Sequence, residues 1–587
     1  MSVFFNGQLL VTPVTASAVN DDAMLNRNLS VGNAIAFIGS SGAGKPMEVL
    51  SFGNPDEARK VLVGGELCDA VVAAFSPSQD TGAAQTVHAV RIDQVSAATL
   101  KVPMSDKPDT LFTLKGKNFK SEDQLTGLKI EAGSAAGLIK MTLAGKSNGM
   151  PWSVVSQDDM NAPRVHLEIL TPKTNLFLNE DQIVVELNPG GVDKRDVYLD
   201  INEFLTLGAV ADVLNAIQND DGDFVAQMTF DSPDDRELLM GVLDKAGFIT
   251  TGKRALTWNA WAIEQWFTQS CGDFVAIEFD KAGKERASKG PLTFDFRYLS
   301  AIASTATTPL HWDDALALLQ TKDVQWVQAV SGNELVHKQV NDHCLLCSNV
   351  LRRERRSICG TGAGVSDADA IARAKALNSK RLSLVHIGHY AYNAAGKLSL
   401  RPAYMTAGLV AAAFAGANPG TPLTNKTLNI LGVERDLRNP TDTDKLILGG
   451  VMPIENTETG YKVTQSITTW IGDSKYNNRE QSCGVAIDFA IRNVRQAVDP
   501  LRGQKQSPIL LSRAISITKG ALAELARPEP QGPAVLVGDE NSPAYRNVTA
   551  SVEGDVLRIQ FEASPAIPNN YILVTMYAVP YSGSATA

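Results

Sequence analysis

Residues 31–46 of the chain read VGNAIAFIGSSGAGKP. The apolar run over residues 31–38 is typical of a buried strand, and the glycines and serines of residues 39–46 predict a loop directly after it. Asn54 followed by a proline is a helix-start signal, which predicts a helix over Pro55–Leu62. A second helix over residues 67–75 and a strand over 87–92 complete a pattern that indicates an α/β fold.

The loop of this stretch also spells most of a phosphate-binding motif. Gly39-Ser40-Ser41-Gly42-Ala43-Gly44-Lys45 matches GxxxxGK, in which the next residue is a Ser or Thr that ligates Mg²⁺. Here that residue is Pro46, which has neither a hydroxyl nor an N–H group. We therefore interpret the loop as a glycine-rich turn. An α/β nucleotide-binding enzyme that uses Gly39–Lys45 is the alternative.

Composition excludes several classes of protein. The chain has 587 residues, of which 44% are hydrophobic and 20% charged, which is typical of a globular protein of several domains. It carries 54 basic and 64 acidic residues, a formal net charge of −10, so a general nucleic-acid surface is not expected. Six cysteines are too few for a disulfide framework, which favours a reducing compartment. The longest apolar stretch, residues 407–417, is too short to span a membrane.

Three further patterns have a catalytic or metal-binding interpretation, and each has a simpler one. Cys344 and Cys347 form a single CxxC, which we interpret as buried thiols on one helical face. The glycines of residues 360–364 lack the third glycine of a dinucleotide fingerprint at the required position and indicate a tight strand-to-helix turn. His386 and His389, three apart in a strand, face opposite sides and cannot chelate one metal together. We expect no catalytic residue, metal site or cofactor.

The whole chain is predicted to be a multidomain protein of α/β and α+β class. Short alternating runs with turns between them predict an inserted β-rich domain, a barrel or sandwich, over residues 99–200. We expect the first part of the α/β core over 29–98, an α/β domain with a mainly parallel sheet over 201–400, and an α+β domain over 401–569. Further predictions are a helix over 234–246, strands over 445–448 and 466–471, a long amphipathic helix over 483–498, and a hairpin turning near Gly554.

Both ends of the chain carry apolar extended segments. Residues 1–28 begin with Phe4, Phe5, Leu9, Leu10 and Val11, a short extended stretch with no strand partner nearby in the sequence. The other end, residues 570–587, predicts a last strand over 571–579 whose apolar residues include Tyr571, Ile572, Val574 and Met576. A terminal strand has to pair with something, inside the chain or outside it. Pairing within the same domain is the alternative to pairing with another molecule.

Taken in order, several segments resemble contractile-tail sheath proteins of bacteriophages. They are the strand, glycine-rich turn and proline of residues 34–46, the arginine-rich stretch 352–360, the segment RPAYMTAGLVA at 401–411, residues 461–470, and SPAIPNNYI at 564–572. Each segment is weak alone, and their common order across nearly the whole chain is the signal. The sheath of a tailocin or of another contractile injection system is the close alternative.

The resemblance implies a structural subunit and not an enzyme. Sheath subunits form stacked six-fold rings around a tail tube, and contraction drives the tube through the host envelope. The implied partners are further copies of the chain, the tail tube, and baseplate and tail terminator proteins. The implied location is the virion tail, after assembly in the host cytoplasm, with no nucleic acid or membrane partner. Residues 1–28 and 570–587 would be arms that add strands to neighbouring subunits, and 99–200 an exterior domain. The helix over 483–498 would face the tube, with Arg492, Arg495, Arg502 and Lys505 as candidate contacts. An ordinary solvated helix face is the alternative for these basic residues.

Overall fold

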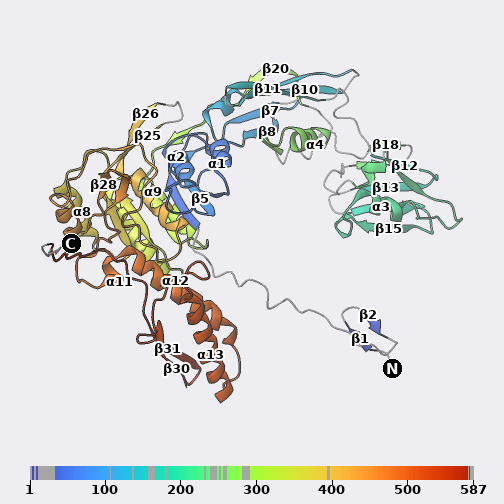
Figure 1. Cartoon of the computed structure of the whole chain (residues 1–587). Helices are drawn as coiled ribbons and strands as arrows, with labels where there is room; N and C mark the ends of the chain where they lie inside the picture. Colours follow the sequence, from blue (N-terminus) through green and yellow to red (C-terminus); the bar gives the residue numbers. More distant parts are fainter. Residues whose placement is uncertain are drawn as a thin grey trace, which may run out of the picture.

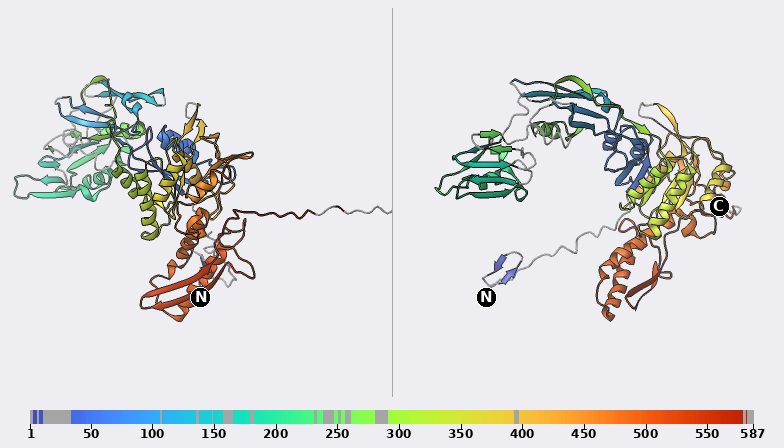
Figure 2. Two further views of the ribbon diagram at one scale, coloured as in Figure 1. Left: turned by 90° about the vertical axis from the view of Figure 1, so that its left-hand side faces the viewer. Right: turned by 180° about the vertical axis from the view of Figure 1, so that it is seen from behind.

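A computed structural model gives the fold (Figure 1). It describes residues 3–5, 8–10, 34–105, 108–134, 138–147, 149–156, 165–178, 182–230, 233–237, 247–249, 253–255, 261–279, 291–392, 397–578 and 581. A core of sheet and helices carries an elongated β-rich insertion on one side and a smaller lobe, built around two helices and a hairpin, on another (Figures 1 and 2). In the part of the chain described, no helix is both long and apolar enough to cross a membrane.

The core sheet combines strands from distant parts of the sequence. Strand β3 (Ala34–Gly39) lies between β5 (Thr86–Arg91) and β22 (Trp326–Ala329), parallel to both, and β4 (Val49–Phe52) is an antiparallel edge. A parallel bridge from Trp326 to Arg356 brings β23 (Ser357–Gly360) alongside, together with its parallel partner β24 (Leu382–Val385). The predicted parallel sheet is therefore confirmed, and its strands come from both sides of an insertion.

Helices cover both faces of this sheet because successive residues of β3 point to opposite sides. Ile35 and Phe37 join one apolar cluster with α1 (Pro55–Leu62), α2 (Glu66–Ala73) and α9 (Ala403–Gly416). Ala36 and Ile38 join a second cluster on the other face, with α6 (Pro309–Leu319), α7 (Glu334–Asn349) and α8 (Asp367–Leu377). The helix over Pro55–Leu62 has its predicted bounds, and the Asn54 side chain accepts a hydrogen bond from the Glu57 amide at its start.

Helix α9 is the innermost helix of the core. Twelve of its residues are buried, so it has no face for water. A methyl group on Gly408 would lie 3.0 Å from the Phe37 ring, which shows how closely α9 packs on β3. The boundary predicted at residue 400 therefore separates this helix from the sheet that it packs on, because α9 contacts β22, β23 and β24 as well.

The β-rich insertion ends near residue 305, whereas the sequence pattern predicts its end at residue 200. Strand β19 (Val275–Phe279) pairs with β8 (Thr110–Gly116), and β20 (Phe294–Tyr298) pairs with β9 (Gly127–Ala132). The predicted domain of 201–400 is therefore wrong in its first third, because these residues complete sheets begun much earlier. The described strands form separate small sheets, ordered β19-β8-β7, β11-β10-β9-β20, β16-β12-β18 and β15-β14-β13-β17.

The other strands of the insertion are β7 (Thr99–Pro103), β10 (Ile139–Ser147), β11 (Met150–Val155), β12 (Val165–Ile169), β13 (Thr174–Leu178), β14 (Gln182–Leu187), β15 (Arg195–Asp200), β16 (Ala226–Phe230), β17 (Gly247–Ile249) and β18 (Lys253–Ala255). Its helices are α3 (Leu207–Leu214) and α4 (Trp261–Ser270). The predicted helix over 234–246 begins as a 3₁₀ turn, Pro233–Glu237, and its remainder lies outside the described residues. The chain enters and leaves the insertion through the short pair β6 (Gln94–Val95) and β21 (Ser304–Thr305).

Two strands predicted in the C-terminal half are wrong. Residues 445–448 lie in a short helix, α10 (Thr443–Leu448). This helix follows a tight turn in which the Asp442 carboxylate accepts a hydrogen bond from the Arg438 amide. Residues 466–471 have an irregular conformation, buried over 466–469, because their polar groups bond to other segments. The Thr468 hydroxyl donates to the Asn478 carbonyl and the Thr469 hydroxyl to that of Ser379. The other elements here are β25 (His389–Tyr392), β26 (Leu398–Arg401), β27 (Gly432–Val433), β28 (Ile454–Thr457), β29 (Gly460–Val463) and α11 (Tyr476–Arg479).

The long helix and the hairpin near the C-terminus are confirmed. Helix α12 (Gln481–Val498) runs from the core into the smaller lobe and packs there on α13 (Pro508–Leu525). The hairpin of β30 (Tyr545–Glu553) and β31 (Val556–Ala563) lies against α13 and turns at Gly554, whose φ of +59° suits glycine. Figure 1 shows α13, β30 and β31 together below the core.

We expect the core to fold without the insertion. The apolar cluster of the insertion, from Ala98 to Leu299, shares no residue with the two clusters of the core. Replacing residues 97–302 by Asn-Gly would join Ser96 to Ala303, which already share a backbone hydrogen bond, through a two-residue hairpin turn. The Gly44 amide would lose its bond to the Asn118 carbonyl, and Arg91 its bond to Phe119, at a cost of about 1–3 kcal/mol.

Urea unfolding followed by circular dichroism measures this cost, with the full chain as the control. An excised chain that is unfolded or aggregated would contradict the independence of the two cores.

Candidate functional site: the terminal segments and the arginine cluster at helix α12

The N-terminal residues form a hairpin. The sequence pattern predicts a single extended stretch without a nearby partner, so that prediction is wrong here. β1 (Val3–Phe5) pairs antiparallel with β2 (Gln8–Leu10), with Phe4 opposite Leu9. The sequence held a signal for this pairing, since Asn6-Gly7 is the residue pair most typical of a two-residue hairpin turn. Val11 lies outside the described residues. Figure 1 draws the hairpin away from the rest of the described chain.

The C-terminal segment leaves the body of the protein unpaired. The Ala566 amide donates to the Val535 carbonyl at 2.9 Å, and Asn570 bonds through its side chain. From Tyr571 to residue 578 the described chain forms no strand, although we predicted one. Its apolar side chains face solvent: the exposed fraction is 83% for Ile572 and 87% for Val574. A strand needs a partner, and the described part of this chain supplies none.

A buried carboxylate joins α12 to the core. Asp488 on α12 accepts from Arg356 Nε at 2.7 Å and from Arg381 Nη1 at 2.9 Å. The Arg356 guanidinium also donates to the Lys380 carbonyl and to the Gln481 side chain. Burial alone would raise the pKa of Asp488, but the charges of Arg356 and Arg381 outweigh it and hold that pKa below its usual range. The arginine-rich stretch is therefore an internal tie between α12 and the sheet.

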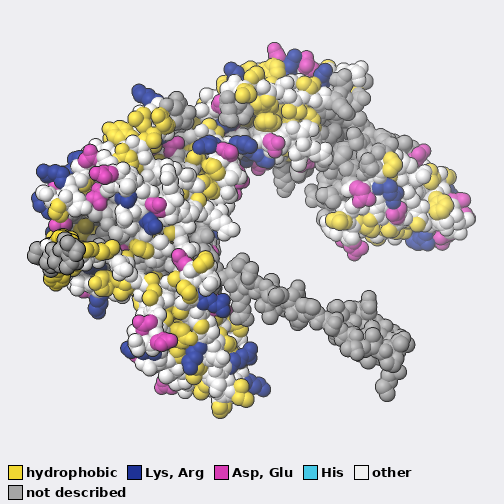
Figure 3. Space-filling model, viewed as in Figure 1, with side chains coloured by type: hydrophobic (Ala, Val, Ile, Leu, Met, Phe, Trp, Pro, Cys, Tyr) yellow, Lys and Arg dark blue, Asp and Glu magenta, His cyan; other side chains and the backbone are white. Residues whose placement is uncertain are grey.

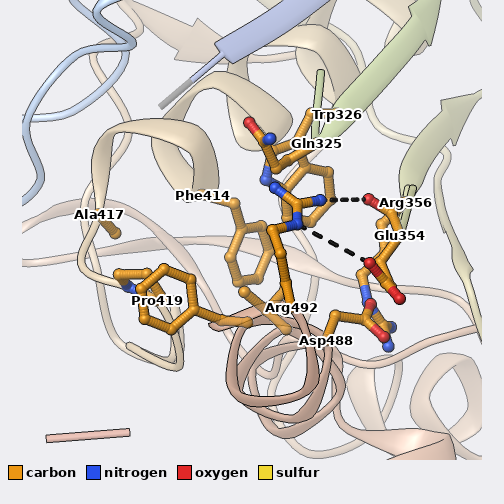
Figure 4. Close-up of a pocket in the computed structure, with 11 residues that line it drawn as sticks. Gln325, Trp326, Glu354, Arg356, Phe414, Ala417, Pro419, Asp488 and Arg492 are labelled. Carbon is orange, nitrogen blue, oxygen red and sulfur yellow. Dashed lines mark hydrogen bonds and ion pairs between the residues drawn. The ribbon is translucent and has the colours of Figure 1, made fainter. Parts of the chain in front are cut away.

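Two of the four proposed tube contacts belong to the same tie. Arg492 is buried, and its Nη2 donates to the Glu354 carbonyl at 3.0 Å. Arg495 donates to the Glu354 carboxylate and to the Arg352 carbonyl. Figure 4 shows the Arg492 side chain directed at Glu354, beside the stacked rings of Trp326 and Phe414. The prediction that Arg492 faces a partner is wrong, because its guanidinium group is buried inside the chain. Arg495 is only half-buried, so its role as a tube contact stays a prediction.

Arg355 is a third internal arginine. Its side chain has no exposed surface, and its Nη2 donates to the carbonyls of Leu319 and Lys322 just after α6. Its Nη1 donates to His343 Nε2 at 2.8 Å, which requires that ring nitrogen to be unprotonated. Burial, aided by the Arg355 charge, lowers the pKa of His343 to about 3. The neutral ring thus serves as a hydrogen-bond acceptor for the arginine.

Basic residues that are exposed lie further along the chain, on the lobe of α13. Residues 500–523 contain four basic residues and no Asp or Glu. These four, Arg502, Lys505, Arg513 and Lys519, are all exposed, and we call them the α13 basic strip. Arg502 pairs with Asp499 at 2.5 Å. Figure 3 shows Lys and Arg side chains on this lobe among apolar ones, with some Asp and Glu beside them. Arg502 and Lys505 were predicted from the sequence, whereas Arg513 and Lys519 were not.

Three amides of the glycine-rich loop are bound to acceptors within the protein and cannot hold a phosphate. The amide of Ser41 donates to Asp93, that of Gly42 to Gly64, and that of Gly44 to Asn118. The chain after Pro46 continues into strand β4, so no helix begins there. Lys45 pairs at the surface with Glu48. The interpretation as a structural turn is confirmed.

The other candidate sites also have structural roles. Cys344 and Cys347 are both buried on α7, and burial raises the pKa of Cys344 to about 12. His386 bonds to Asp367 and His389 to Thr406, so the two rings serve different partners. Gly360 lies against α9, where a Cβ would meet the Tyr404 backbone at 2.3 Å. Among the described residues, no group of three His, Cys, Asp or Glu side chains could hold a metal ion.

Comparison with known proteins gives relatives of one kind. No family model matches the chain. The chain is 26% identical over 607 residues to the tail sheath protein of Bacillus phage SP01, covering 100% of this chain and 98% of that protein. It is 24% identical over 503 residues to a protein described as a tail sheath protein in Enterococcus phage phiEF24C, covering 83% and 84%.

Solved structures agree on the fold. A sheath tail protein from Desulfitobacterium hafniense matches with a TM-score of 0.51 at 11% identity, covering 94% of this chain and 100% of that one. One from Listeria innocua matches with a TM-score of 0.52 at 11% identity, covering 91% and 92%. The chain is therefore related to phage contractile-tail sheath proteins, as the resemblance implied, and these relatives are structural proteins rather than enzymes.

The Asp488 tie makes a prediction about stability. Asp488→Ala leaves two guanidinium groups, mostly buried, without their shared carboxylate, and we expect the free energy of unfolding to fall by about 3–5 kcal/mol. Because the folded-state pKa of Asp488 is depressed, its contribution is present at neutral pH and is lost as the pH falls below about 4. Urea titrations at pH 7 measure the difference.

Asp499→Ala is the matched control, since this carboxylate pairs with Arg502 at the surface and its loss is expected to cost under about 1 kcal/mol. Equal losses of unfolding free energy in the two variants would mean that the buried ion pairs of Asp488 stabilise the fold no more than a surface pair does.

Proposed function

We propose that this chain is the sheath subunit of a contractile phage tail. Copies stack as six-fold rings around the tail tube, and contraction of the stack drives the tube through the host envelope. The observation that carries the proposal is the relationship to the tail sheath protein of phage SP01 along the entire chain. The subunit would reside in the virion tail, after assembly in the host cytoplasm, with the tube, baseplate and tail terminator as partners.

The two ends of the chain support polymerisation by strand addition. The exposed apolar segment that begins at Tyr571 has extended, unpaired backbone, which is what a strand donated to a neighbour requires. The hairpin β30–β31 is a suitable acceptor. Its two strands pair only with each other among the described residues, so both outer edges are open. An isolated two-stranded hairpin is marginal in water, and added strands from neighbours would complete a sheet.

The α13 basic strip is the surface that we assign to the tube. It takes the place of Arg492, which is buried, and keeps Arg502 and Lys505. Of these four exposed cations, only Arg502 forms an ion pair among the described residues, with Asp499, and the four together favour an acidic partner surface by charge complementarity. The β-rich insertion extends away from α13 and the core (Figure 1), which supports an exterior position for it.

Two alternatives are weaker. A sheath from a tailocin or other injection system would have nearly the same architecture, but the two relatives matched by sequence come from phages. A nucleotide-binding enzyme would need amides in the Gly39–Lys45 loop that point at a phosphate, and three of them are bound to protein acceptors.

Removing either end is expected to leave a folded monomer that does not polymerise. Deletion of residues 1–20 or of 571–587 removes a donated segment but no residue of the core clusters. Negative-stain electron microscopy at high concentration, with and without tail tube, would show striated tubes for the full chain and single particles for the truncations. Deletion of residues 582–587 alone, which spares the apolar segment, is the control and should still assemble. Truncated chains that still build tubes would refute the arm assignment.

Charge reversal on the α13 basic strip is expected to weaken tube attachment. Arg513→Glu with Lys519→Glu should reduce co-sedimentation with the tube at least tenfold at low salt, and added salt should weaken the wild-type chain similarly. Lys60→Glu with Lys426→Glu, which lies outside the strip, is the control. Attachment that is unchanged in the Arg513 and Lys519 variant would remove the strip from the tube interface.

A further inference from the structure

The point at which the C-terminal segment leaves the body is held by one side chain. Asn570 Oδ1 accepts from the Thr424 hydroxyl at 3.2 Å, and its Nδ2 donates to Glu480 Oε2 at 3.4 Å. Within the described residues, Asn570 is the last one with a hydrogen bond to the body, and Tyr571 beyond it is 81% exposed. The amide group of Asn570 therefore marks the boundary between fixed and free chain.

The carboxylate on one side of Asn570 is buried and held by neutral donors. Glu480 is 2% exposed and lies at the start of α12. Its Oε1 accepts from the hydroxyls of Ser466 and Ser482, and its Oε2 from the amides of Gln465 and Asn570. A buried carboxylate that loses one such donor is costly to leave unsatisfied, so the bond to Asn570 is favoured.

The hydroxyl on the other side of Asn570 belongs to a fixed loop. Thr424 follows α9 and forms a parallel bridge with Val463 of β29, and the next amide, Asn425, donates to the Val463 carbonyl at 2.8 Å. Both partners of Asn570 thus lie on the core: Thr424 is in the loop that follows α9, and Glu480 is at the start of α12. Neither lies on the hairpin β30–β31, although the chain passes from that hairpin to Asn570.

We propose that Asn570 is a positioning residue that clamps the base of the C-terminal segment to the core through Thr424 and Glu480. The clamp sets the direction in which the segment leaves. It also passes a pull on the segment to α9 and α12 rather than to the small lobe, a consequence that rests on the proposed role of the segment as an arm. The clamp itself is a property of the isolated chain.

Distances between spin labels on the isolated chain test the clamp. Labels on Ile572→Cys and Glu458→Cys, both exposed positions, report how the base of the segment moves relative to the core. The six native cysteines are buried and burial raises their thiol pKa values, so the added cysteines should be labelled selectively. We expect a narrow distance distribution for the wild-type residue at 570.

Asn570→Asp places a second carboxylate beside Glu480, and the two should repel each other. We therefore expect the distance distribution to widen about twofold or more. Asn569→Asp makes the same change of charge at the exposed neighbouring residue and should leave the distribution narrow. Glu480→Gln keeps an acceptor for Asn570 and should also stay narrow, whereas Thr424→Val should widen it. Thermal unfolding of each variant identifies any loss of fold.

A distribution that is equally narrow in the Asn570→Asp and Thr424→Val variants would overturn the clamp. Because the measurement needs no polymer, failure of the chain to form tubes would affect only the proposed function. If the spin-label distances contradict the clamp, the proposed function still stands or falls by the electron microscopy of tube formation.

Discussion

Helix α9 is the element on which the rest of the structure depends. With twelve buried residues it has no side for water, so it can exist only when other elements cover it all round. The cover comes from α2 and β3, early in the chain, and from β22, β23 and β24, far later. Both halves of the chain must therefore close on one helix, which requires the insertion between them to begin and end at one place. The pair β6–β21 provides that place.

A second constraint fixes the lobe to this core. Asp488 on helix α12 forms ion pairs with Arg356 and Arg381. Arg492 and Arg495 on the same helix donate hydrogen bonds to Glu354. Burying charges costs hydration, so an apolar contact of the same size could be as stable. What the charged tie adds is a single position for α12, because each carboxylate must meet its own guanidinium groups. The positions of α13, β30–β31 and the start of the C-terminal segment follow from the position of α12.

Local signals in the sequence predicted local structure well. The Asn54 cap, helix α12, the turn at Gly554 and the glycine-rich loop each depend on a few neighbouring residues. Errors arose where distant residues decide. The predicted boundary at residue 200 is wrong because no local sequence signal near β19 or β20 indicates that their partner strands lie more than 150 residues earlier. Arg492 was assigned to the surface because Glu354, its partner, is 138 residues away in the sequence.

The terminal segment is best understood through what it would cost an isolated protein. A run of exposed tyrosine, isoleucine, leucine and valine without a charge is a ready template for strand pairing, and such edges are usually blocked or covered. Here the chain does neither: among the described residues the segment is unpaired, and the body holds it only as far as Asn570. A partner strand that covered this segment would bury apolar surface that is now in water, which favours the pairing. Among the described residues, this segment therefore has the character of a strand that lacks its partner, which is what the proposed role as an arm requires.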